Sequence, residues 1–140
     1  MRKSALKYTY KAKEFSVVAE AVLQLFLAYL TVSYLPSQKY LHITSTKSNL
    51  ILTEEKIKNG EIIAGIIDGL SLRTPWLSTC LMKVLTAHKM FDRRNISHII
   101  HFGIKKNSSC ELNAHAWLSV ADEVLIGGEN LNDFHEILRF

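Results

Sequence analysis

The stretch Ile96-Ser-His-Ile-Ile-His-Phe-Gly-Ile104 marks the point where the hydrophobic pattern changes from a helical period to a strand period. Its bulky residues recur at every second position, which is typical of a strand with one buried face. Ala114-His-Ala-Trp-Leu-Ser-Val120 predicts a second strand, and the tight turn 121–123 leads into a third strand over 124–126. A last short strand is predicted over 137–140. We therefore expect an antiparallel meander in this part of the chain.

The chain before this point is predicted to be helical. From Phe15 to Gln38 the only charged residue is Glu20, and a helix is expected from about Tyr10 to Tyr34. About 20 apolar residues are enough to span a membrane, so a span and a buried or interfacial helix compete. Glu20 and Gln24 give the helix a polar stripe, which favours packing on the protein domain.

Two further helices are predicted between this segment and the strands. Residues 36–52 form a connector with a short helical turn. Thr53 then caps a helix that ends near Leu70. Ser78 and Thr79 cap the next helix, over Cys80–Phe91. The order of helices and then strands predicts an α+β fold, with N-terminal helices packed on a small antiparallel sheet. Residues 1–140 form a single domain, with a helical part (1–72) and a catalytic helix plus strands (73–140).

The composition excludes several classes of protein. The chain has 140 residues, of which 48% are hydrophobic and 21% charged, with 2 Pro and 6 Gly, so it is neither disordered nor of low complexity. Two cysteines are too few for a disulfide scaffold. Residues 1–47 hold seven basic and two acidic residues, which suggests a solubilising or membrane-proximal tail. A nucleic-acid-binding domain would usually carry basic and aromatic residues interleaved along one face, and the sequence contains no such stripe.

Cys80 is the strongest candidate for a catalytic residue in the sequence. It lies in the first turn of a predicted helix, where backbone N–H groups and the helix dipole favour a thiolate and could stabilise an oxyanion. The alternative is a buried structural cysteine. A nucleophilic cysteine needs a base, and His115 lies 35 residues downstream on a predicted strand.

Metal and cofactor sites are not predicted. His98 and His101 with Cys110 have the residue types for zinc, but positions i and i+3 of a strand face opposite sides and a fourth ligand is missing. Cys110, in a polar loop, is expected to be a free exposed thiol. No phosphate-binding glycine loop and no Gly-x-Ser-x-Gly motif occurs.

Four segments taken together resemble one family, the leader peptidases of lasso-peptide maturation, which are transglutaminase-like cysteine proteases. The resemblance covers residues 73–140 in order. It is carried by Pro75-Trp76-Leu-Ser-Thr79-Cys80-Leu81, His101-Phe-Gly-Ile-Lys105-Lys106, Asn113-Ala-His115-Ala-Trp117-Leu and Val124-Leu-Ile-Gly127-Gly128-Glu129, followed by Phe134 and Phe140.

The resemblance implies roles for particular residues. Cys80 would be the nucleophile and His115 the general base. Some relatives carry an orienting acid twelve residues after the histidine, but Gly127 stands there in this chain. Glu129 is the preferred substitute and Asp122 the other candidate. The two tryptophans, Trp76 and Trp117, would form walls of the substrate site or serve as ordinary core residues.

The resemblance also implies an activity and a set of partners. The protein would be a cytoplasmic endopeptidase that removes the leader from a lasso precursor peptide, with no cofactor. It would act with a separate small leader-recognition protein and an asparagine-synthetase-like cyclase. A transglutaminase-like acyl transferase and a non-enzymatic membrane-associated assembly factor are the alternatives. Whether residues 15–35 contact a membrane stays open.

Overall fold

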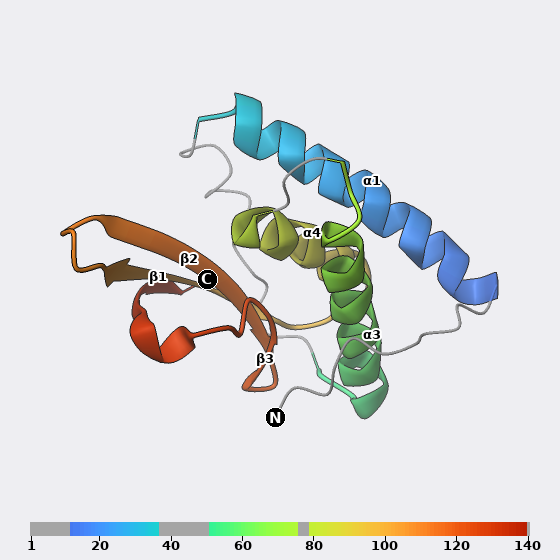
Figure 1. Ribbon diagram of the computed structural model, residues 1–140. Coiled ribbons are helices and arrows are strands. Elements are labelled where there is room, and N and C mark those ends of the chain that lie inside the picture. The colour runs from blue at the N-terminus through green and yellow to red at the C-terminus, as the bar shows by residue number, and fades with distance from the viewer. Residues whose placement is uncertain (1–11, 37–50, 76–78, 140) are drawn as a thin grey trace.

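Three helices precede a four-stranded antiparallel sheet in the computed structural model, which describes residues 12–36, 51–75 and 79–139 (Figure 1). The predicted α+β class is therefore confirmed. The elements in chain order are α1 (Ala12–Tyr34), α3 (Glu54–Ser71), α4 (Cys80–Arg93), β1 (Ile99–Lys106), β2 (Leu112–Val120), β3 (Glu123–Ile126), the short 3-10 helix η2 (Leu131–Asp133) and β4 (His135–Arg139). The described residues do not include Tyr10, Trp76, Ser78, Phe140 or most of the 36–52 connector.

Both predicted hydroxyl caps begin helices. The Thr53 hydroxyl accepts a hydrogen bond from the Lys56 N–H at 3.3 Å, and the Thr79 hydroxyl accepts one from the Met82 N–H at 3.4 Å. Each hydroxyl satisfies one N–H group that the first helical turn leaves without an acceptor. The starts of α3 and α4 therefore follow directly from local sequence.

The junction between α4 and β1 differs from the sequence prediction. α4 ends at Arg93, two residues later than expected, and the chain then turns at Asn95, whose φ is 52°. The Ile96 N–H bonds back to the Phe91 carbonyl at 3.0 Å, so Ile96 belongs to the turn. The strand therefore begins at Ile99, three residues after the start of the alternating pattern.

The sheet has the strand order β3-β2-β1-β4, so the expectation of a simple meander is wrong for the last strand. β2 pairs with β1 on one side and β3 on the other, which leaves no free edge on β2. β4 adds to β1, which has eight residues and offers a longer ladder than the four residues of β3. Residues 127–134 consequently connect opposite edges of the sheet.

One face of the sheet packs under the helices. α4 lies against β2, and α3 lies against β3. Ala116, Leu118 and Val120 alternate along β2 and belong to the same buried core as residues of all three helices. Because neighbouring side chains on a strand point to opposite faces, the alternate residues His115, Trp117 and Ser119 lie on the other face of the sheet.

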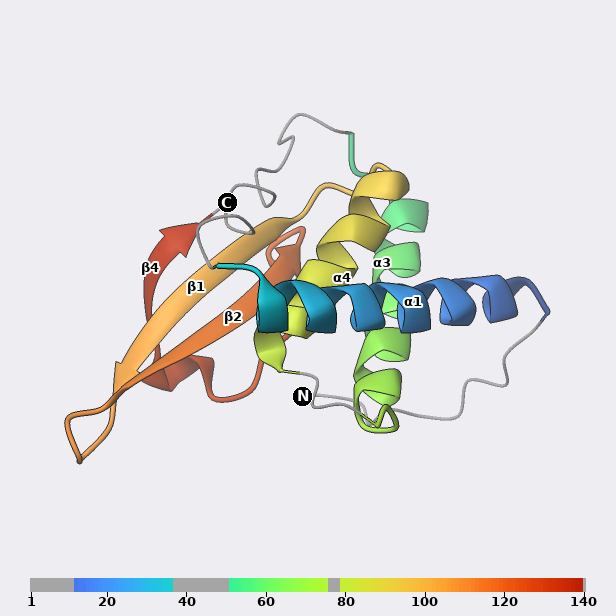
Figure 2. The ribbon, with the colours of Figure 1, turned by 90° about the horizontal axis from the view of Figure 1, so that it is seen from above.

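Helix α1 runs across α3 and α4 (Figure 2). Ala21 and Leu25 are fully buried against the other helices. Glu20 forms ion pairs with Arg94 at 2.6 Å and Arg93 at 3.2 Å, both at the end of α4. Among the described residues, Phe15–Tyr34 is the one helix whose length and composition would allow a membrane span. The predicted packing of this helix on the domain is confirmed, and its contact with a membrane stays a prediction.

Candidate active site

Cys80 is the first residue of α4. Its side chain is half-buried and packs against the hydrophobic core, and the thiol is free of any disulfide. Thr79 supplies acceptors for the N–H groups of Met82 and Lys83. The N–H groups of Cys80 and Leu81 have no acceptor within the helix, as in any helical first turn. Cys80 therefore lies at a helix start, as the sequence predicts, and its role as the nucleophile stays a prediction.

His115 is half-buried on β2, and its ring is held by the backbone. The His115 Nε2 atom lies 2.7 Å from the Gly127 carbonyl oxygen. A carbonyl oxygen can only accept, so Nε2 must carry the proton in this hydrogen bond. In the neutral ring the lone pair is then on Nδ1. The tautomer thus leaves one defined nitrogen of His115 to act as a base.

Gly127 can hold this carbonyl in place because it is a glycine. Its φ is +74°, a left-handed conformation that side chains disfavour. A Cβ atom built there would lie 2.6 Å from the Ala116 carbonyl oxygen and 3.1 Å from the Trp117 Cα. The sequence analysis noted that Gly127 takes the position of the acid found in some relatives, but it considered only side chains as substitutes and did not consider the Gly127 carbonyl.

Aromatic rings surround His115. Its ring centroid lies 4.9 Å from that of Phe134 and 6.0 Å from that of Trp117. Trp117 also stacks on His101 at 5.4 Å with nearly parallel planes. The Trp117 ring fits against the backbone of Gly103, where a Cβ would lie 2.7 Å from it. Trp117 is 7% exposed, so here it packs beside His115, and its role as a substrate wall stays a prediction.

The fold brings the helix of Cys80 and the strand of His115 together, because α4 packs on β2. Cys80 packs into the core on the helix side, whereas the recorded contacts of the His115 ring are with Gly127, Trp117 and Phe134. Within the described ranges no hydrogen bond joins the Cys80 thiol to the His115 ring. Catalysis by this pair therefore requires the two side chains to approach each other.

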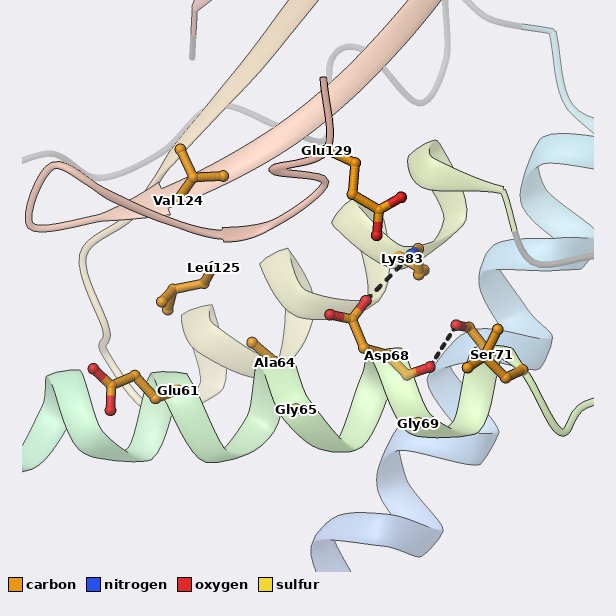
Figure 3. A pocket seen from close by; sticks show the side chains of 11 residues that line it. Glu61, Ala64, Gly65, Asp68, Gly69, Ser71, Lys83, Val124, Leu125 and Glu129 are labelled. Carbon is orange, nitrogen blue, oxygen red and sulfur yellow. Dashed lines mark hydrogen bonds and ion pairs between the residues drawn. The ribbon is translucent and has the colours of Figure 1, made fainter. Parts of the chain in front are cut away.

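Glu129 lines a pocket of about 390 Å³ between α3, α4 and β3. Figure 3 shows its carboxylate directed towards Lys83, whose Nζ lies 3.2 Å from the Asp68 carboxylate. The hydrogen bond recorded for the His115 ring is with Gly127, and the orienting role expected for Glu129 stays a prediction. Asp122 and Ala121 both have positive φ and form the turn between β2 and β3, so turn geometry accounts for Asp122.

A second polar cluster lies on the same face of the sheet. The His101 Nε2 atom lies 2.8 Å from the Ser119 hydroxyl, and Nδ1 lies 3.3 Å from a Glu136 carboxylate oxygen. This second contact has the distance of an ion pair without the alignment of a hydrogen bond. Arg139 also bonds Glu136, at 2.8 Å, and this hydrogen bond lowers the pKa of the carboxyl. Ser119 and His101 are each 6% exposed, so their hydrogen bond is a buried polar contact between β2 and β1.

Three helices packed on a four-stranded antiparallel sheet are consistent with the papain-like and transglutaminase-like class of α+β domains. The chain belongs to the transglutaminase-like superfamily, whose family model matches residues 27–139. Comparison with curated proteins found no match, and comparison with solved structures found none either. Superfamily membership suggests activity of the cysteine protease or acyltransferase type.

Proposed function

We propose that this protein is a cysteine endopeptidase that removes the leader peptide from a lasso precursor. The observation that carries the proposal is the hydrogen bond between His115 and the Gly127 carbonyl, because it leaves Nδ1 as the proton acceptor. Superfamily membership supports acyl-transfer chemistry at a cysteine. The resemblance of residues 73–140 to the leader peptidases supplies the substrate class.

In the proposed reaction, His115 Nδ1 takes the proton of the Cys80 thiol as the sulfur attacks the carbonyl carbon at the junction of leader and core. The N–H groups of Cys80 and Leu81 stabilise the oxyanion. The imidazolium then protonates the leaving amine as the C–N bond breaks, which frees the core peptide. Water, deprotonated by His115, hydrolyses the thioester and restores the thiol and the neutral ring.

The neutral partner of His115 has a consequence for the rate. A carboxylate would stabilise the imidazolium by charge, and a carbonyl does so only as a hydrogen-bond acceptor. The thiol and the ring also have to approach each other, since Cys80 packs against the core and the ring contacts Phe134. We therefore expect slow cleavage by this protein alone, and acceleration by a separate protein that holds the leader.

The test is cleavage of a precursor peptide in the presence of its leader-binding protein, followed by mass spectrometry. We expect free leader and core from the wild type, no product from Cys80→Ala, and a decrease of at least about 10³-fold for His115→Ala. Cys110→Ser is the matched control, because Cys110 is an exposed loop thiol, and it should cleave normally.

Cleavage that survives in Cys80→Ala would reject the proposal. A product that contains a new amide crosslink in place of free leader would assign the acyl-transferase alternative, because both reactions share one acyl-enzyme. If neither product forms and Cys80 reacts with iodoacetamide no faster than a denatured-state thiol, the non-enzymatic alternative holds.

A further inference from the structure

The outer face of helix α1 is apolar along most of its length. α1 lies on the outer side of α3 and α4 (Figure 1 and Figure 2). Its exposed residues recur three or four positions apart, so they share one face of the helix. The large hydrophobic members of this face are Phe15, Val22, Leu23, Phe26, Leu27 and Tyr34. Between positions 15 and 34 the other exposed residues are an alanine and two serines, so the outer face carries no charge there.

The opposite side of α1 packs on the domain. Ala21 and Leu25 are fully buried, and Ala28 is 7% exposed. A helix that spanned a bilayer would have to leave α3 and α4, because their charged residues are costly to place in the hydrocarbon. The packed helix instead has the form of one that lies in the plane of a membrane interface, with its apolar side at the boundary between headgroups and acyl chains.

The sequence just before this face is strongly basic. Residues 1–14 contain five basic residues and one acidic residue, and Lys13 belongs to the first turn of α1, two positions before Phe15. Basic residues next to an apolar helix face are attracted to membranes that contain anionic lipids. The outer face of α1 is therefore accompanied by the charge that an anionic bilayer would complement.

The acid next to the outer face is balanced by the domain itself. Glu20 is the one acidic residue between positions 15 and 34. It forms ion pairs with Arg94 at 2.6 Å and with Arg93 at 3.2 Å, and the Arg93 side chain is 64% exposed. Because two guanidinium groups face one carboxylate, Glu20 does not give this side of the molecule a negative charge.

We propose that α1 docks flat on an anionic phospholipid membrane, with its outer face in the interface and the preceding basic segment attracted to the headgroups. A second copy of the chain would also cover an apolar face, but it would bring the same excess of positive charge, whereas an anionic bilayer brings the opposite charge. The docking uses neither Cys80 nor His115, so it is independent of the proposed peptidase reaction.

The test is sedimentation of the full chain with lipid vesicles, at low and at high salt. One set is made of phosphatidylcholine alone, and the other of phosphatidylcholine mixed with an equal amount of phosphatidylglycerol. We expect binding to the mixed vesicles to be at least about tenfold tighter, because only these vesicles attract the basic segment. Binding should weaken as the salt concentration rises, since salt screens this attraction.

Two variants separate the contributions of the apolar face and the basic segment. Leu23→Glu should weaken binding to the mixed vesicles at least about tenfold, because it places a charge on the side that enters the interface. Leu112→Glu is the matched control and should bind as the wild type does, since it makes the same change at an exposed leucine of β2. The double variant Lys7→Gln, Lys11→Gln should weaken binding about thirtyfold, because each basic residue near an anionic surface contributes a factor of about five.

The proposal is overturned if the wild type does not bind the mixed vesicles, if it binds both sets equally, or if Leu23→Glu binds as tightly as the wild type. If Leu23→Glu lowers Tm, Phe15→Glu decides, because the Phe15 side chain is 74% exposed and can be changed without opening the core. Wild-type protein that stays on the vesicles after a carbonate wash would assign a membrane span. A dimer in light scattering that Leu23→Glu dissociates would assign the face to a second copy, and either result would overturn flat docking.

Discussion

The two faces of the sheet are built from alternate residues of the same strands, yet they differ in chemistry. On the face under the helices, Leu118 and Val120 are aliphatic and almost fully buried. On the opposite face, His101, His115 and Trp117 form a row of stacked rings with polar partners. The comparison teaches that one strand can supply stability and candidate chemistry independently, because a single residue step changes the face.

The largest expected effect in this comparison concerns the helix-side face. Leu118→Ala should lower the free energy of unfolding by about 3 kcal/mol, since it leaves a cavity in a fully buried site. Urea unfolding measures the change. Ser119→Ala, on the opposite face, is the neighbouring control, and losing its hydrogen bond to His101 should cost about 1 kcal/mol. Equal losses for both variants would contradict the division between the faces.

The second prediction tests the backbone support of His115. Gly127→Ala should destabilise the protein by about 2 kcal/mol, because the new Cβ would meet the Ala116 carbonyl and the left-handed φ would be strained. NMR measures the result: the Nε2–H proton of His115 should exchange faster with water and change its chemical shift, because its hydrogen bond to the Gly127 carbonyl is lost.

Gly128→Ala is the matched control for that variant. Its Cβ would lie 3.3 Å from the Val124 side chain, and its backbone has no positive φ. The ring signals of His115 should therefore keep their wild-type behaviour. If Gly127→Ala also left them unchanged, another group would have to hold the His115 ring.

The smallest effect concerns charges at the rim of the outer face. Arg139 lowers the pKa of Glu136 below its value in the unfolded chain, so the pair stabilises the protein above that unfolded value and loses its effect as the pH falls through the folded one. Glu136→Gln should cost about 0.5 kcal/mol at pH 7, because the pair is largely exposed. Denaturation over a series of falling pH values measures this, and the difference in stability between the two proteins should shrink as the pH falls.

Local features of the chain were predictable where one or two residues decide the structure. The hydroxyls of Thr53 and Thr79 mark helix starts, and bulky residues at every second position mark the strands. Ile96 was assigned wrongly because a hydrogen bond to Phe91 continues the turn through a strand-like pattern. The place of β4 was missed because pairing to β1 depends on which edge is free, and no residue of β4 encodes that.

The candidate site was predictable in its residue types and less so in its contacts. Cys80 at a helix start and His115 on a strand follow from local patterns. The hydrogen bond from His115 to the Gly127 carbonyl was not predicted, because every residue has a backbone carbonyl and the sequence does not show which one lies near the ring.

The crossing of residues 127–134 from one sheet edge to the other gives the chain an order of events during synthesis. Cys80 and His115 leave the ribosome before Gly127 and Phe134, which hold the His115 ring. β4 cannot close the free edge of β1 until residues 135–139 have also emerged. A growing chain therefore carries both side chains without their final arrangement. The contacts that fix the His115 ring are therefore complete only after residues 127–134 have been made.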